Sequence, residues 1–165
     1  MPRPALQIDN SAPEPSAHSL ITLRTMGPTQ FIDITDRIAA LVDVTGVSLG
    51  IVNVQALHTT TAILVNENEP LLLTDFEATL SRTVPAERRY LHDDPSLRAV
   101  NLTPNERRNG HSHCRALLLG ASACLNIVEG RLMLGQWQRL FFVELDGPRE
   151  RLVSAMVLGQ AGTRR

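Results

Sequence analysis

Leu140-Phe141-Phe142-Val143 is the stretch of sequence that decides the fold of this chain. Successive side chains of a strand point to opposite faces, so these four residues make a strand that is apolar on both sides. Such a strand lies either inside a layered β structure or at a subunit interface. We therefore predict a buried strand over residues 137–145, and the second alternative suggests an oligomer.

The sequence around this strand predicts an α+β fold. Leu72, Phe76 and Leu80 recur at helical spacing after Pro70, which indicates a helix over residues 70–82. A second helix is expected between Thr35 and Gly46, and a short third one over residues 111–120. Strands and helices come in blocks rather than as a strict βαβ alternation, which favours a mostly antiparallel sheet. The further strands are predicted over residues 19–25, 30–34, 47–55, 62–65, 122–128, 131–134 and 151–158.

Composition narrows the classes of function. The chain has 165 residues, 43% of them hydrophobic, and a net charge of −1, and a chain of this length can bury about 70% of its unfolded surface. The balanced charge and 4% aromatic content argue against a nucleic-acid partner. All 16 basic residues are Arg. Lysine Schiff-base chemistry is thereby excluded, and phosphate recognition is left to Arg and backbone amides.

The two ends of the chain differ in character. Residues 1–18 contain four prolines and few large apolar side chains, so we predict a disordered tail, with residues 19–165 forming one domain. No apolar run approaches the ~18 residues of a membrane span, and no secretory signal is seen. These features predict a cytoplasmic protein with no membrane partner. Cys114 and Cys124 are expected to be reduced thiols.

Histidines supply the candidate chemistry. Four of the five lie between positions 58 and 113: His58, His92, His111 and His113. Imidazole is the commonest metal ligand and the usual general base. His58 follows a predicted strand, where it could equally be a hydrogen-bonded strand end. His92 begins His-Asp-Asp in a polar loop over residues 83–110, which suits either metal ligation or an ordinary solvated turn.

Asn109-Gly110-His111-Ser112-His113 is the sharpest local signal. In an extended segment the two imidazoles share one face and could chelate an ion, whereas on a helix they point roughly 200° apart. The segment also resembles a helix start, where backbone amides, Ser112 and Arg115 could bind phosphate. Cys114 is expected to face the core.

Three further charged residues can each be interpreted as structural or as functional. Glu67 precedes the helix at Pro70, where helix electrostatics alone could explain it, and Asp75 lies on the side of that helix. Arg149 could pair with Glu144 or hold an anion.

Taken together, the motifs resemble the YjbQ-like family, whose members are often named secondary thiamine-phosphate synthases. The resemblance covers about residues 19–160 in collinear order. It implies a two-layer, β-sandwich-like α+β core with two main helices, assembled as a homotrimer with a polar pocket near the subunit boundaries. The motifs that carry it are His58-Thr59-Thr60, residues 66–70, Asp75-Phe76, His92-Asp93-Asp94, residues 109–113, Gly135-x-Trp137-Gln138 and residues 144–149.

The activity implied by the resemblance is a weak transferase reaction. It joins hydroxymethylpyrimidine diphosphate to thiazole phosphate and releases pyrophosphate. The alternatives are a non-enzymatic trimer that binds a metal or small ligand, and a metal-dependent hydrolase. A divalent metal, Zn²⁺ or Mg²⁺, is expected and no organic cofactor, with histidine ligands suiting a transition metal better. The implied roles are catalysis by His58, His92, His113 and Glu67, phosphate binding by Asn109, Ser112, Arg115 and Arg149, and metal ligation by His58, His111, His113 and Asp75.

Overall fold

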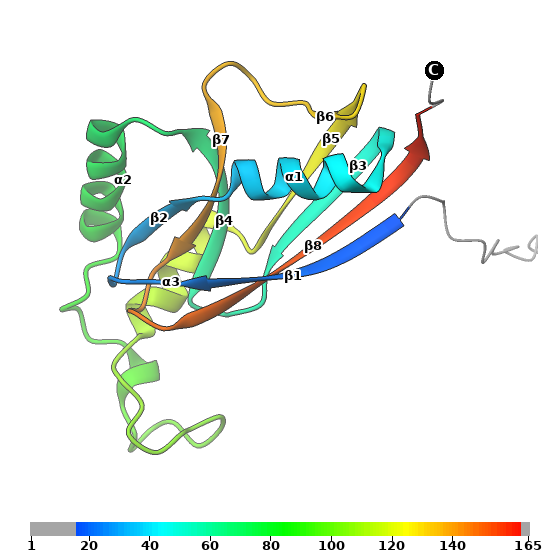
Figure 1. Ribbon diagram of the computed structural model, residues 1–165. Coiled ribbons are helices and arrows are strands. Elements are labelled where there is room, and N and C mark those ends of the chain that lie inside the picture. The colour runs from blue at the N-terminus through cyan, green and yellow to red at the C-terminus, as the bar shows by residue number, and fades with distance from the viewer. Residues whose placement is uncertain (1–15, 163–165) are drawn as a thin grey trace, which may run out of the picture.

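The computed structural model describes residues 16–162 and places two antiparallel sheets around a shared interior (Figure 1). The predicted α+β class and antiparallel pairing are confirmed, with three α-helices in the described part of the chain. The helices are α1 (Thr35–Thr45), α2 (Pro70–Thr83) and α3 (Gly110–Leu119), with a short 3₁₀ helix η1 (Leu91–Asp93). The strands are β1 (Ser16–Arg24), β2 (Gln30–Asp33), β3 (Val47–Ala56), β4 (Thr61–Glu67), β5 (Ser122–Val128), β6 (Arg131–Leu132), β7 (Gln138–Glu144) and β8 (Glu150–Ala161).

The apolar strand found in the sequence is β7, the central strand of the smaller sheet. That sheet has the order β2-β7-β4, and the larger one has the order β1-β8-β3-β5-β6. Phe142 lies opposite Ile32 of β2 and Ile63 of β4. Residues 141–144 of β7 are therefore paired on both edges, and the side chains of β7 determine what lies on both sides of the small sheet.

Each face of β7 belongs to a separate apolar cluster. Leu140 and Phe142 face the interior between the two sheets, which α1 closes with Ile38 and Val42. Phe141 and Val143 face the opposite way, toward the surface covered by α2 and α3; the side chains that pack there include Phe31, Leu73, Leu80, Ala116 and Leu119. The chain itself thus buries both faces, and the subunit-interface explanation of this strand is wrong.

Helix α1 is anchored at its start by an ion-paired cluster. The Thr35 N–H donates to Asp33 Oδ1 at 2.9 Å, and Arg139 bridges Asp33 and Asp36 at 2.7 and 2.9 Å. The helix ends where expected, at Gly46, whose φ of 69° is a left-handed conformation that glycine adopts without strain. None of the helices between residues 16 and 162 is long and apolar enough to cross a membrane.

Strand β1 starts three residues earlier than predicted. Ser16 pairs with Leu158, and His18 Nε2 lies 2.9 Å from Ser154 Oγ. The prediction that residues 1–18 are all tail is therefore wrong for its last three residues, because β8 is long enough to pair with them. Residues 1–15 of that tail, and residues 163–165, lie outside the described part.

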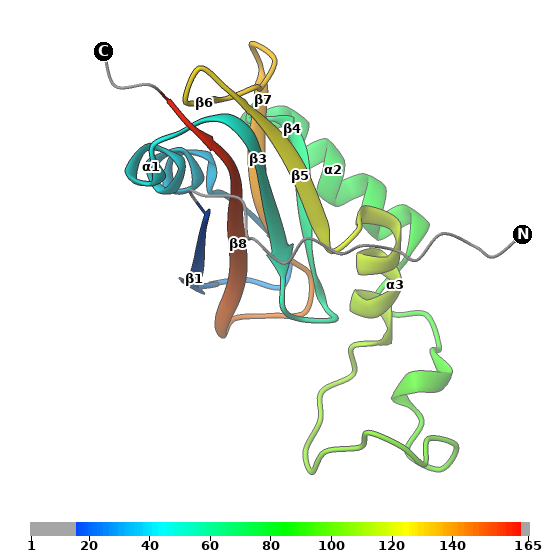
Figure 2. The same cartoon turned by 90° about the vertical axis from the view of Figure 1, so that its right-hand side faces the viewer.

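Residues 84–109 form an arm between α2 and α3 that projects away from both sheets (Figures 1 and 2). This is the long polar loop expected from the sequence, and its base is clamped onto α3. Asp93 Oδ1 accepts hydrogen bonds from the N–H groups of Asn109 and Gly110 at 3.0 and 2.9 Å. A Cβ on Gly110 would lie 2.5 Å from Tyr90 Cβ, so only glycine fits beneath the Tyr90 ring.

We predict that Phe141→Ala and Phe142→Ala each lower the free energy of unfolding by about 3–5 kcal/mol, because each opens a cavity in a different cluster. Urea unfolding monitored by circular dichroism measures the effect. Trp137→Ala is the control: that side chain is 65% exposed, and exposed changes cost about 0.5 kcal/mol or less. If Phe141→Ala lowered the free energy of unfolding only at protein concentrations where chains associate, this face would be covered by another chain and not by α2 and α3.

Candidate functional site

A pocket of about 480 Å³ opens where the base of the arm meets the ends of the strands. This volume is in the range of small-molecule sites. Five of the predicted site residues meet there: His58, His92, Asn109, His113 and Arg149. The other residues that line the pocket are Leu57, Thr59, Thr60, Arg98, Asn101, Glu106 and Arg151.

The floor of the pocket is a buried ion pair between Glu144 of β7 and Arg151 of β8. Two bonds of 2.6 Å join the guanidinium to both carboxylate oxygens, and the side chains are 0% and 3% exposed. Glu144 also accepts from Thr25 Oγ1 and from the N–H groups of residues 145–147. Burial alone would raise the pKa of Glu144, but the bonds from Arg151 and the backbone amides hold it below its usual value.

His58 is engaged by the backbone at the edge of the pocket. The Leu152 N–H donates to His58 Nε2 at 2.9 Å. Burial, followed by the charge of Arg151, lowers the pKa of His58, so the ring is neutral near pH 7. With Nε2 accepting a hydrogen bond, the ring has no free lone pair for a metal or a proton. The predicted roles of His58 as metal ligand and general base are therefore wrong for this arrangement.

His92 of η1 and His113 of α3 form the arm side of the pocket. Their rings meet edge to face with centroids 4.5 Å apart. Burial, then the neighbouring His92, lowers the pKa of His113, which keeps that ring neutral. His92 Nε2 is buried and has no hydrogen-bond partner in the described part of the chain. It lies 4.0 Å from Glu106 Oε1, and Glu106 is held by Arg98 at 2.9 Å.

Asn109 adds a second unpartnered buried atom. The residue is 8% exposed, its backbone N–H is bonded to Asp93, and its side-chain Oδ1 has no hydrogen-bond partner. Buried polar atoms in folded proteins are nearly always hydrogen-bonded. The pocket wall therefore holds two buried polar atoms, Asn109 Oδ1 and His92 Nε2, that no group within residues 16–162 satisfies.

Arg149 shares one carboxylate with a second arginine. Its Nη2 contacts Asp146 Oδ2, and Nη2 of Arg107, from the arm, lies 3.9 Å from the same oxygen. The Asp146 side chain is only 2% exposed. One carboxylate cannot neutralise two guanidinium groups, so this corner keeps a surplus positive charge suited to an anion.

Ser112 and Arg115 serve the structure rather than a phosphate. The Ser112 hydroxyl donates to the Leu145 carbonyl at 2.7 Å. Arg115 is buried and donates to the Val84 carbonyl at 3.1 Å and to the Ser81 and Thr29 hydroxyls. It thus sits at the negative C-terminal end of α2. Both side chains are buried, bonded elsewhere and outside the pocket lining, so the structure does not support their predicted phosphate contacts.

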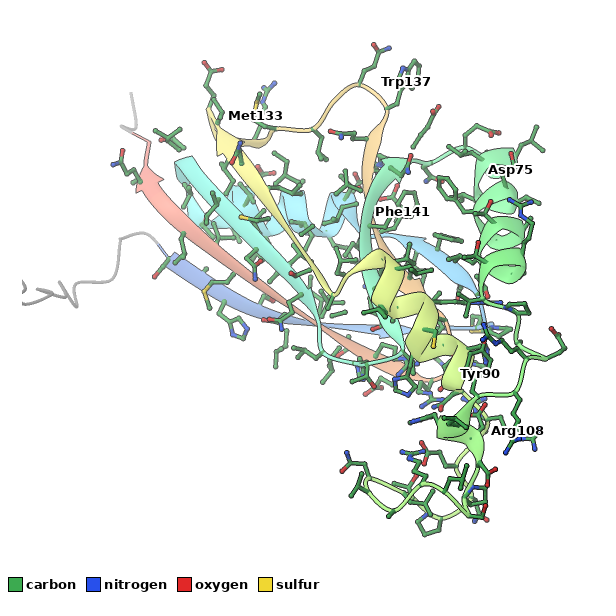
Figure 3. All side chains as sticks on the ribbon, turned by 180° about the vertical axis from the view of Figure 1, so that it is seen from behind. Asp75, Tyr90, Arg108, Met133, Trp137 and Phe141 are labelled. Atoms are coloured by element: carbon green, nitrogen blue, oxygen red, sulfur yellow. The ribbon has the colours of Figure 1, made fainter. Side chains whose placement is uncertain are left out.

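Three other predicted site residues lie away from the pocket. Glu67 ends β4, and the seven residues of that strand put it about 20 Å from the pocket end. Asp75 is exposed on α2, apart from the arm base marked by Tyr90 (Figure 3). His111 turns toward Tyr90, as the helical alternative for this motif implies, with ring centroids 6.4 Å apart.

The predicted metal ligands are consequently not brought together. Within residues 16–162 no group of three or more His, Cys, Asp or Glu side chains is placed to hold a metal ion. Both cysteines are free; Cys114 is partly buried and Cys124 is exposed.

Sequence reasoning missed Arg98 and Arg151, and it offered Arg149 as the partner of Glu144. The structure instead pairs Glu144 with Arg151, and Arg149 with Asp146. One feature of the sequence could have predicted the ion pair between Glu144 and Arg151. A glutamate that ends a strand buried on both faces needs a charged partner, and Arg151 lies on the adjoining predicted strand.

Comparisons with known proteins agree with this fold. The family model described as "UPF0047 protein YjbQ-like" matches residues 19–160. A UPF0047 protein of Methanothermobacter thermautotrophicus is 41% identical over 140 residues, covering 85% of this chain and 90% of the relative. A crystal structure from Sulfolobus solfataricus, described as a YbjQ-like protein of unknown function, has a TM-score of 0.78 and 32% identity, covering 88% of this chain and 98% of that one. An uncharacterised family member from Clostridium acetobutylicum has a TM-score of 0.74 and 35% identity, with coverages of 85% and 99%.

We predict that Glu144→Gln lowers the free energy of unfolding by about 3–5 kcal/mol at neutral pH, because it leaves the buried Arg151 without its charged partner. The pKa of Glu144 in the fold lies below its ordinary 4.5, so the pair stabilises the protein above pH 4.5. That contribution is lost as the pH falls through the lower folded-state pKa. Urea unfolding of both proteins across this pH range measures it; a difference that stayed constant down to the lowest pH would contradict the assignment.

Proposed function

The chain belongs to the UPF0047 family of YjbQ-like proteins, and we propose that its pocket binds and converts a small phosphorylated substrate. The observation that carries the proposal is the pair of buried, unpartnered atoms, Asn109 Oδ1 and His92 Nε2, beside the incompletely neutralised Arg149. A site with unsatisfied buried polar atoms next to a cationic corner suits a ligand with both polar and anionic groups.

The reaction we propose is weak thiamine-phosphate synthase activity. The thiazole nitrogen bonds to the methylene carbon of hydroxymethylpyrimidine diphosphate, and the carbon–oxygen bond to the diphosphate breaks. Its electron pair leaves with pyrophosphate. Arg149 would stabilise negative charge on a phosphate group, while His92, His113 and Asn109 would orient the polar groups of the substrate.

A resident metal does not fit the side chains of the pocket. The nearest donors are His92, His113 and Glu106, but within residues 16–162 no three such side chains are placed to hold a metal ion, and Arg98 bonds to one oxygen of Glu106. We therefore assign the expected divalent cation to the substrate: an ion such as Mg²⁺ enters bound to the diphosphate, as is usual for phosphate substrates.

We predict that His113→Ala lowers the rate of thiamine phosphate formation at least about tenfold, because the substrate loses a neutral imidazole that positions it. Formation of the product from the two phosphates in the presence of Mg²⁺ is measured by chromatography. The control is Leu71→Ala, at an exposed position of α2 away from the pocket.

The same assay separates the alternatives. Equal turnover in His113→Ala and wild type would remove the catalytic assignment. Binding of either phosphate without turnover would indicate a non-enzymatic ligand-binding protein. Release of phosphate or pyrophosphate without coupling would indicate a hydrolase, and its loss on chelation would make that hydrolase metal-dependent.

We further propose that the chain assembles as a homotrimer through the outer face of the larger sheet. In Figure 2 the described helices leave this face uncovered. Leu49 lies opposite Val128, and Ile51 opposite Leu158, so their side chains form a continuous apolar area. Exposed apolar patches of this kind are typical of protein interfaces. Leu20 and Met156 extend the patch and are also exposed.

We predict that Ile51→Glu converts a trimer to a monomer, because it buries an unpaired charge in the interface. Light scattering after size-exclusion chromatography measures the mass. The matched control is Leu71→Glu, at an exposed position of α2. A wild-type monomer, or an Ile51→Glu protein of unchanged mass, would contradict this interface.

A further inference from the structure

His58 takes the place of a backbone carbonyl at the end of the larger sheet. The ladder between β3 and β8 runs to the pair Ala56 and Val153. The Leu57 N–H then donates to the Leu152 carbonyl at 3.2 Å. Leu152 donates in return not to a backbone oxygen but to His58 Nε2, at 2.9 Å. The imidazole therefore completes the last rung of the ladder as the chain turns away.

This bond determines which nitrogen of the ring carries the proton. A backbone amide can only donate, so Nε2 must hold the lone pair, and the neutral ring has its proton on Nδ1. Within residues 16–162 Nδ1 makes no hydrogen bond, although the ring lines the pocket. His58 thus has one N–H donor that no residue of this described range uses, on a ring that lines the pocket and that the sheet itself holds in place.

Arg149 supplies charge at the same end of the pocket. Arg151 beneath it is neutralised by its bidentate bond to Glu144. Asp146, in contrast, is shared by Arg149 and Arg107, which leaves one surplus positive charge. A fixed N–H donor beside a partly neutralised guanidinium is the usual recognition chemistry of an oxyanion.

We propose that His58 Nδ1–H and Arg149 form an oxyanion subsite, which binds one phosphate or carboxylate group of the ligand. His58 acts there as a hydrogen-bond donor rather than as a base or metal ligand. The proposal deepens the proposed function, on which it rests for the choice of pocket. The surplus of one charge matches a single oxyanion group, so the second phosphate of a diphosphate depends on the cation that it carries.

Two substitutions of His58 separate its two nitrogens. Gln places its side-chain amide near the position of Nε2 and can still accept from Leu152, but it has no donor at Nδ1. Asn places its amide near Nδ1 and can still donate to the pocket, but it cannot reach Leu152. We expect His58→Gln to keep the wild-type melting temperature and to bind inorganic phosphate about tenfold more weakly, the effect of losing one charge-assisted hydrogen bond.

We expect the opposite result for His58→Asn: a lower melting temperature with phosphate affinity retained. Calorimetric titration with inorganic phosphate, and separately with acetate, shows which oxyanion is preferred. Arg149→Gln should weaken binding of the preferred anion, and Leu71→Gln, at an exposed position of α2, should leave it unchanged. If His58→Asn fails to fold, ¹⁵N spectra of the wild-type histidines still report the tautomer.

Two results would overturn the subsite: wild-type phosphate and acetate affinity in His58→Gln, or a proton on Nε2 of His58 in the wild-type spectra. These readouts need no turnover. Phosphate binding that depends on His58 without any synthase activity would contradict only the proposed reaction. Synthase activity with anion binding that is insensitive to His58→Gln would contradict only the subsite.

Discussion

The ion pair between Glu144 and Arg151 joins the two sheets at the end where the pocket lies. Glu144 ends the central strand of the small sheet, and Arg151 lies near the start of β8 in the large one. Thr25, after β1, and Thr60, before β4, bond to the same pair. Removing two charges from water costs several kcal/mol each, so the pair is favourable only when every remaining donor and acceptor is satisfied. Three backbone N–H groups after β7 also donate to Glu144, which ties the turn to this carboxylate.

The same pair sets the chemistry above it. Together with burial, the charge of Arg151 keeps His58 neutral, and a neutral His58 can accept from Leu152 and extend the sheet. The tight turn after Glu144 places Arg149 close enough for its charge to act on this ring. The ion pair at the floor therefore acts on the pocket in two ways. Its charge helps to keep His58 neutral, and its hydrogen bonds help to position Arg149. The arm side depends instead on Asp93, which holds η1 against the start of α3.

The sequence predicted the fold well because periodicity reports directly on burial. The two apolar faces of residues 140–143, the helical spacing of Leu72, Phe76 and Leu80, and the polar loop before Asn109 all correspond to observed features. It predicted the site less well because a motif shows which residues are present but not which of their donors and acceptors remain unbonded in the fold. Ser112 and Arg115 lie in a promising segment, yet their donors end on Leu145 and Val84. Which polar group is already bonded depends on tertiary contacts that no local pattern records.

A family resemblance therefore transfers the identity of a residue but not the bonding of its atoms. Aligning His58 with a functional position transfers the residue, but its chemistry depends on whether Nε2 or Nδ1 faces the pocket. The four clustered histidines divide accordingly: His58 is a fixed donor on the sheet side, His92 and His113 are a packed pair on the arm side, and His111 faces Tyr90 outside the pocket. The pocket thus has an anion-binding end fixed by the sheets and an imidazole end fixed by the arm. A ligand that bridges them must carry its charge at one end and its polar, uncharged groups at the other.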